Sequence, residues 1–108
     1  MQNKQKVLNS LGLALKAGKL VSGEDAVIHA MQNNQTKLIF LASDASIQAK
    51  DKFEKKAFFY GVQIIELFNA EELSKSIGKL HRKAIAICDE GFTKLILGYI
   101  ERGDRYEG

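Results

Sequence analysis

Proline and tryptophan are absent from this 108-residue chain, and Cys88 is its single cysteine. An internal disulfide is therefore impossible, and two histidines with one cysteine do not provide a tetrahedral zinc set of the usual spacing. A chain of this length buries about two thirds of its unfolded surface without such cross-links. Hydrophobic residues at 45% and charged residues at 27% are typical of one folded domain, which excludes a disordered or repeat-based protein.

Long hydrophobic runs are also missing. The longest apolar stretches, such as Leu38–Ala42, are far shorter than the ~20 residues that a membrane-spanning helix needs. Lys4 and Lys6 precede an apolar stretch as in a signal peptide, but Asn9 and Ser10 interrupt it and no cleavage site follows. We therefore expect a cytoplasmic protein with no membrane partner.

The fingerprints of nucleotide-binding enzymes are absent as well. There is neither a P-loop pattern nor a G-x-G-x-x-G motif between a strand and a helix. Cys88 ends a predicted strand, where α/β enzymes often place catalytic groups, but Asp89 and Glu90 follow it and negative charge opposes a thiolate. A small buried strand residue is the simpler interpretation, with a thiol enzyme as the alternative. We expect no catalytic residue, no cofactor and no metal ion.

Hydrophobic periodicity predicts helices and strands in alternation. Helical spacing of apolar residues stops at Gly18, and Ser22 with Asp25 has the form of a capping box that opens the next helix. Asn69 and Glu72 repeat this capping pattern. The predicted helices cover 7–15, 23–32, 47–60, 70–78 and 92–99, and the predicted strands cover 19–21, 37–42, 62–68 and 84–88.

This alternation, at intervals of about 20 residues, predicts an α/β layered sandwich with helices on both faces of the sheet. No linker or internal repeat divides the chain. We expect residues 1–103 to form a single domain and residues 104–108 to form a polar C-terminal tail.

The 16 Lys and Arg residues outnumber the 13 Asp and Glu residues, and the excess is unevenly distributed. Two segments, 1–23 and 73–88, contain no acidic residue, and their basic residues are Lys4, Lys6, Lys16, Lys19, Lys75, Lys79, Arg82 and Lys83. If the loop after the first strand and the one near residues 73–79 lie at the same edge of the sheet, they form a basic patch of the kind that follows phosphates. Ordinary solvated lysines are the alternative.

Three segments, in their order and spacing, resemble a known family. Gly18–Asp25, Lys37–Asp44 and Glu72–Lys79 are similar to the kink-turn-binding family of large-subunit ribosomal proteins, and the first segment looks especially like its small bacterial YlxQ branch. The resemblance covers about residues 5–90. It implies a three-layer α-β-α sandwich around a mixed sheet of about four strands, no catalytic activity, and binding to a sharply bent RNA element in which tandem sheared G·A pairs follow a bulge.

The family's RNA-reading signature, G-x-N-E-x-x-K, corresponds here to a segment that starts at Gly23. Gly23 matches it, Glu24 occupies a variable position, and the remaining signature positions hold Asp25, Ala26 and His29. An aspartate can accept hydrogen bonds from the N1 and N2 donors of guanine but cannot donate one. Base recognition and capping of its own helix are both open for Asp25. His29 is a weaker phosphate partner at pH 7 than a lysine.

The resemblance implies a second contact, in which an apolar side chain of a loop packs on a splayed base. Leu73 stands at the matching position with Ser74 beside it, although a leucine in this pattern is more commonly a helix-packing residue. The candidates for phosphate contacts, which position RNA without reading its sequence, are Lys19, Lys37, Lys75 and Lys79.

We therefore predict a non-enzymatic, monomeric RNA-binding protein whose partner is ribosomal RNA or another structured RNA. It would recognise a bent helix by shape, backbone charge and a few base edges, because side chains cannot read the deep, narrow major groove of A-form RNA. The alternative is a protein-interaction scaffold of the same fold that has lost kink-turn specificity.

Overall fold

The computed structural model describes the backbone of residues 3–107 and the side chains of residues 3–101. Within this part of the chain, helices and strands alternate as the hydrophobic pattern predicts. The helices are α1 Lys4–Lys16, α2 Glu24–Gln32, α3 Ile47–Tyr60, α4 Ala70–Ser76 and α5 Glu90–Glu107. The strands are β1 Leu20–Ser22, β2 Leu38–Leu41, β3 Gln63–Ile65 and β4 Ala84–Ile87.

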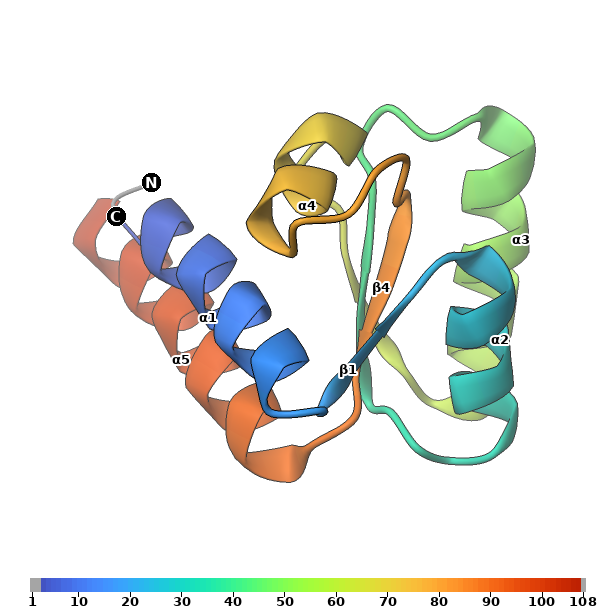
Figure 1. Cartoon of the computed structure of the whole chain (residues 1–108), viewed down its shortest axis with the longest axis horizontal. Coiled ribbons are helices and arrows are strands. Elements are labelled where there is room, and N and C mark those ends of the chain that lie inside the picture. The colour runs from blue at the N-terminus through green and yellow to red at the C-terminus, as the bar shows by residue number, and fades with distance from the viewer. Residues whose placement is uncertain (1–2, 108) are drawn as a thin grey trace.

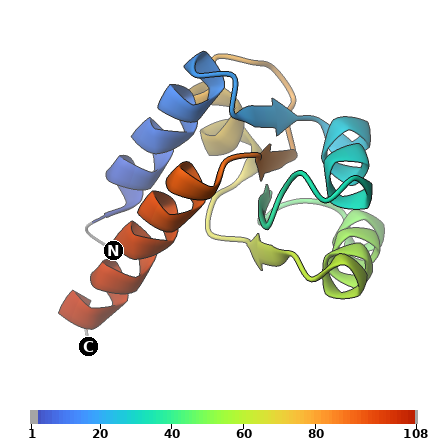
Figure 2. The same cartoon turned by 90° about the horizontal axis from the view of Figure 1, so that it is seen from below.

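The strands form one mixed sheet in the order β1-β4-β2-β3 (Figure 1). β4 runs antiparallel to both β1 and β2, and β2 runs parallel to β3. Figure 2 shows α1, α4 and α5 on one face of the sheet and α2 with α3 on the other. The predicted α-β-α sandwich around a four-stranded mixed sheet is therefore confirmed.

The hydrophobic core lies on both faces of the two central strands, and every residue of β2 and β4 is buried. Phe40 of β2 packs against Phe68, with ring centroids 6.0 Å apart. Phe53 of α3 is likewise buried on the sheet. Burying a side chain of this size contributes about 1.5–3 kcal/mol. The core therefore holds the ends of the central strands, and the loops attached to them, in place.

One of the two predicted capping boxes forms. The side chain of Asn69 accepts a hydrogen bond from the Glu72 amide at 2.8 Å, and the Glu72 carboxylate accepts one from the Asn69 amide at 3.0 Å. The box predicted at Ser22 is wrong, because Ser22 pairs with Ile85 as the last residue of β1 and the chain enters α2 one residue later. Gly23 is the N-cap, with a φ of 98° that a residue with a side chain rarely adopts.

Several element boundaries also differ from the prediction, those of β3 and α5 among them. β3 is shorter than the predicted 62–68, since the chain leaves the sheet after Ile65 and the Phe68 carbonyl bonds instead to the Ser43 amide at 2.8 Å. α5 continues to Glu107, so helical backbone covers most of the segment predicted to be a polar tail. That segment has no proline to interrupt the helical hydrogen bonds. Gly108, the last residue of the predicted tail, lies outside the described residues.

Candidate functional site

The N-terminus of α2 lies beside the loop 77–83 that joins α4 to β4 (Figure 1). The Gly23 amide donates a hydrogen bond to the carbonyl of Ala84, the first residue of β4, at 2.9 Å. A hollow of about 520 Å³ is lined from both segments, by Gly23, Glu24, Asp25, His81 and Lys83. Two segments that are far apart in the sequence thus form one continuous surface.

The loop 77–83 is held in place by Arg82 and Ser74. The Arg82 Nε donates to the Ser22 hydroxyl at 3.0 Å, and its Nη1 donates to the Leu80 carbonyl at 3.0 Å. The Ser74 hydroxyl accepts from the Arg82 amide at 2.8 Å and donates to the Arg82 carbonyl at 3.2 Å. Ser74 is 7% exposed and its hydroxyl fixes the loop to α4, so little of its side chain is available for the predicted contact with RNA.

The apolar residue exposed at this edge is Leu80, not the predicted Leu73. The Leu73 side chain is 0% exposed, because α4 turns it into the core, where no base can reach it. Leu80 is 77% exposed and lies in the loop between Lys79 and His81. Sequence periodicity could not single out Leu80, which belongs to no helix or strand. The available signal was an isolated leucine within a run of basic residues.

The basic residues near the ends of the strands fall into two groups, at opposite ends of the sheet. Lys79 and Lys83 belong to the loop beside α2, whereas Lys19 accepts a backbone hydrogen bond from Cys88, just beyond the far end of β4, at 2.8 Å. Because β1 runs antiparallel to β4, Lys19 is about 13 Å along the strand from Gly23. Lys37 precedes β2 and borders a different hollow, of about 430 Å³, with Cys88. Lys19 and Lys37, both predicted as phosphate contacts, therefore do not share a surface with Lys79.

The acidic residues at the start of α2 differ in their surroundings. The Glu24 carboxylate pairs with the Lys52 ammonium of α3 at 3.2 Å. Asp25 is exposed, and His29 lies one helical turn further along the same face. Among the residues that the structure describes, no side chain caps this end of α2. The capping role considered for Asp25 therefore does not form with Ser22, and the amide groups of the first turn have no side-chain acceptor among the described residues.

Cys88, the alternative catalytic candidate, is partly buried at the end of β4, and the aspartates near the ends of β2 and β4 accept hydrogen bonds from backbone amides. Burial raises the pKa of the Cys88 thiol, while a backbone hydrogen bond from Val21 opposes this shift. A raised pKa leaves less of the nucleophilic thiolate at neutral pH. Asp44 accepts a hydrogen bond from the Ala70 amide at 2.9 Å, at the start of α4. Asp89 accepts one from the Phe92 amide at 2.8 Å, in the first turn of α5.

These features define a small α/β domain with one charged edge that carries an exposed leucine and a helix N-terminus. Over the described residues, no helix has the length and apolar character to cross a bilayer. The model of the ribosomal protein L7Ae/L30e/S12e/Gadd45 family matches residues 5–97. The chain belongs to this family.

Individual relatives agree with that assignment. The chain is 42% identical to the RNA-binding protein YlxQ of Enterococcus faecium, over 92% of this chain and 95% of that protein. It is 37% identical to the RNA-binding protein YlxQ of Bacillus subtilis (strain 168), over 84% and 91% of the two chains. A solved structure of a protein with unknown function from Bacillus halodurans C superposes with a TM-score of 0.83 at 38% identity, covering 89% of this chain and 97% of that one.

Proposed function

We propose that this protein binds RNA without catalysing a reaction, and that its target is a sharply bent element of the kink-turn type. The observation that carries the proposal is the hollow shared by the start of α2 and the loop 77–83. Relatives at 42% and 37% identity are named RNA-binding proteins, which supports the same conclusion. Ribosomal RNA is one candidate partner because the family includes ribosomal proteins.

Phosphate binding in this proposal uses the positive groups around the hollow. Lys79, Lys83 and the backbone amides of the first turn of α2 offer positive charge and hydrogen-bond donors to phosphate oxygens. Lys75 on α4 borders the neighbouring hollow that also contains Lys79. These contacts fix the position of the RNA and give salt-dependent affinity, but they do not read its sequence.

Base recognition in this proposal uses Asp25 and Leu80. The exposed Asp25 carboxylate can accept hydrogen bonds from the N1 and N2 donors of guanine. Leu80 offers an apolar surface to a base that has left the helical stack. A bend is required because bases in a regular A-form helix are stacked and their major-groove edges lie too deep for side chains.

The full set of proposed RNA-contacting residues follows from these arguments. Gly23, Glu24 and His29 complete the α2 surface: Gly23 by its backbone conformation, Glu24 through its pairing with Lys52, and His29 as an exposed imidazole one turn away. Because Asp25, Ala26 and His29 depart from the family signature, we expect weaker binding than that signature would support. The proposal also includes a monomeric state and a cytoplasmic location.

The test compares a kink-turn RNA with a straight duplex of equal length over a series of salt concentrations. We expect tighter binding to the kink-turn at every salt concentration, and Asp25→Ala should weaken only that complex, by about 1–3 kcal/mol. Lys79→Gln should weaken binding to both RNAs and lower the salt slope by about 0.9. Lys94→Gln on α5, whose lysine is exposed and paired with Glu90, is the matched control.

Equal affinity for the two RNAs at all salt concentrations would contradict the proposal and favour the interaction scaffold. The proposal is also contradicted if Lys94→Gln weakens binding as strongly as Lys79→Gln, because the positive charge would then act without a defined site.

A further inference from the structure

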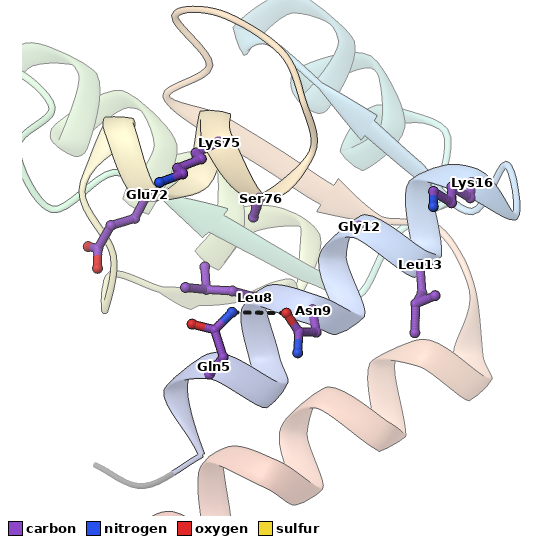
Figure 3. Close-up of a pocket in the computed structure, with 9 residues that line it drawn as sticks. All are labelled: Gln5, Leu8, Asn9, Gly12, Leu13, Lys16, Glu72, Lys75 and Ser76. Carbon is purple, nitrogen blue, oxygen red and sulfur yellow. Dashed lines mark hydrogen bonds between the residues drawn. The ribbon is translucent and has the colours of Figure 1, made fainter.

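A further hollow, of about 700 Å³, lies between α1 and α4 and is not part of the edge described above (Figure 3). Along α1 it extends from Gln5 to Lys16, a length of about 16 Å at the helical rise. On the α4 side it is bordered by Glu72, Lys75 and Ser76. We call this hollow the α1–α4 groove.

At the middle of the α1–α4 groove the two helices approach closely because Gly12 has no side chain. A Cβ atom at this position would come within 2.9 Å of the Ser76 carbonyl oxygen, a distance that would force the helices apart. The two helices therefore approach through backbone, and the groove has a narrow floor. Leu8 and Leu13 provide apolar surface beside it, and Leu13 is 57% exposed.

Positive charge lies at both ends of the groove. Figure 3 shows Lys75 at one end and Lys16 at the other. Glu72 is the acidic residue on the rim, and one of its carboxylate oxygens is occupied by the capping bond with the Asn69 amide at 3.0 Å. Two ammonium groups at the ends of a groove with one rim carboxylate favour a chain that carries several negative charges, such as a phosphodiester backbone.

The groove also carries unused hydrogen-bonding capacity. The Gln5 Nε2 donates to the Asn9 Oδ1 at 2.9 Å (Figure 3). This bond leaves the Gln5 carbonyl oxygen as an acceptor and the Asn9 amide hydrogens as donors, and both side chains are exposed. Carboxamide groups that offer a donor and an acceptor together match the edge of an unpaired base.

Lys75 connects the groove with the proposed RNA interface. It borders the α1–α4 groove and also a hollow of about 470 Å³ that contains Lys79, Leu80 and His81. We propose that the α1–α4 groove binds a single-stranded segment of RNA that leaves the bent element and crosses α4 at Lys75. Phosphates of this segment contact Lys75 and Lys16, and a base contacts Gln5 and Asn9. This inference rests on the proposed function.

The experiment compares a blunt-ended kink-turn RNA with the same RNA carrying a single-stranded extension of about four nucleotides, placed in turn on each strand end. Fluorescence anisotropy is measured over a salt series. We expect one of the extended RNAs to bind more tightly, with a salt slope steeper by about 0.7, because Lys16 adds one single-strand phosphate contact while Lys75 already contacts the bent element.

Two variants assign this gain to the groove. Lys16→Gln should remove about 0.7 from the slope of the extended RNA, and Asn9→Ala should reduce its advantage, while neither changes the affinity for the blunt RNA. Lys55→Gln on α3, an exposed lysine on the opposite layer of the sandwich, is the matched control and should change neither affinity. Circular dichroism checks that each variant is folded.

The outcomes separate the two proposals. If the blunt kink-turn RNA binds in preference to a straight duplex but neither extension adds affinity or slope, the groove proposal is overturned and the proposed function stands. A gain that persists unchanged in Lys16→Gln and Asn9→Ala also overturns it, because the extension then binds elsewhere. If no kink-turn RNA is preferred to the duplex, the proposed function fails and the groove proposal fails with it.

Discussion

Two leucines lie near the α4–β4 connection. Truncating Leu73 should lower the stability of the protein, whereas truncating Leu80 should lower its affinity for RNA. Leu80 is 77% exposed in the free protein, so Leu80→Ala removes few contacts and should change the free energy of unfolding by less than about 0.5 kcal/mol. Leu73 is 0% exposed, so Leu73→Ala leaves a cavity in the core. Its expected cost is about 2–5 kcal/mol of the free energy of unfolding.

The affinity for RNA should fall in Leu80→Ala, although the stability of this variant hardly changes. Fully burying a leucine side chain contributes about 1.5–3 kcal/mol, and 77% of Leu80 is available to be covered by a base. Leu80→Ala should therefore weaken kink-turn binding by roughly 1–2 kcal/mol, or about five- to thirtyfold in Kd. Because a straight duplex offers no unstacked base, its affinity should not change.

Urea denaturation and fluorescence anisotropy measure the two effects separately. Leu95→Ala is a suitable control, since Leu95 is exposed on α5 away from the loop 77–83. Our argument would be refuted if Leu80→Ala bound the kink-turn as tightly as the unmodified protein, or if it lost as much stability as Leu73→Ala.

Two further predictions concern the loop 77–83 and the thiol. Ser74→Ala removes both hydrogen bonds between the Ser74 hydroxyl and the Arg82 backbone, so the free energy of unfolding measured by urea denaturation should fall by about 1–3 kcal/mol. Ser43 is exposed, so the control Ser43→Ala should have little effect. Equal losses in the two variants would count against the role of Ser74. Burial raises the pKa of Cys88, so iodoacetamide should alkylate it more slowly at pH 7 than it alkylates the urea-unfolded chain. Because the pKa of Cys88 is raised in the folded state, the free energy of unfolding should also fall as the pH rises past the ordinary pKa of a thiol. Alkylation of the folded protein as fast as that of the unfolded chain would contradict a raised pKa.

Local patterns in the sequence were sufficient to predict the layered sandwich. Helices and strands follow from hydrophobic periodicity and capping residues, which act over a few neighbouring positions. The capping box at Asn69 and Glu72 formed as predicted because both partners lie within one helical turn. The box at Ser22 did not form, because pairing of β1 with β4 placed Ser22 in the sheet and brought Arg82 to its hydroxyl.

The location of the candidate site depended on contacts between distant residues. Lys19 and Gly23 are close in sequence, yet they lie at opposite ends of β1, and only the strand order decides which of them faces the loop 77–83. Leu73 and Leu80 are chemically identical, and the packing of α4 on the core decides which remains exposed. The sequence alone thus determined the elements and the layered fold, because these follow from local hydrophobic order. Tertiary structure decided which side chains share a surface, because that depends on where strands end and how helices pack.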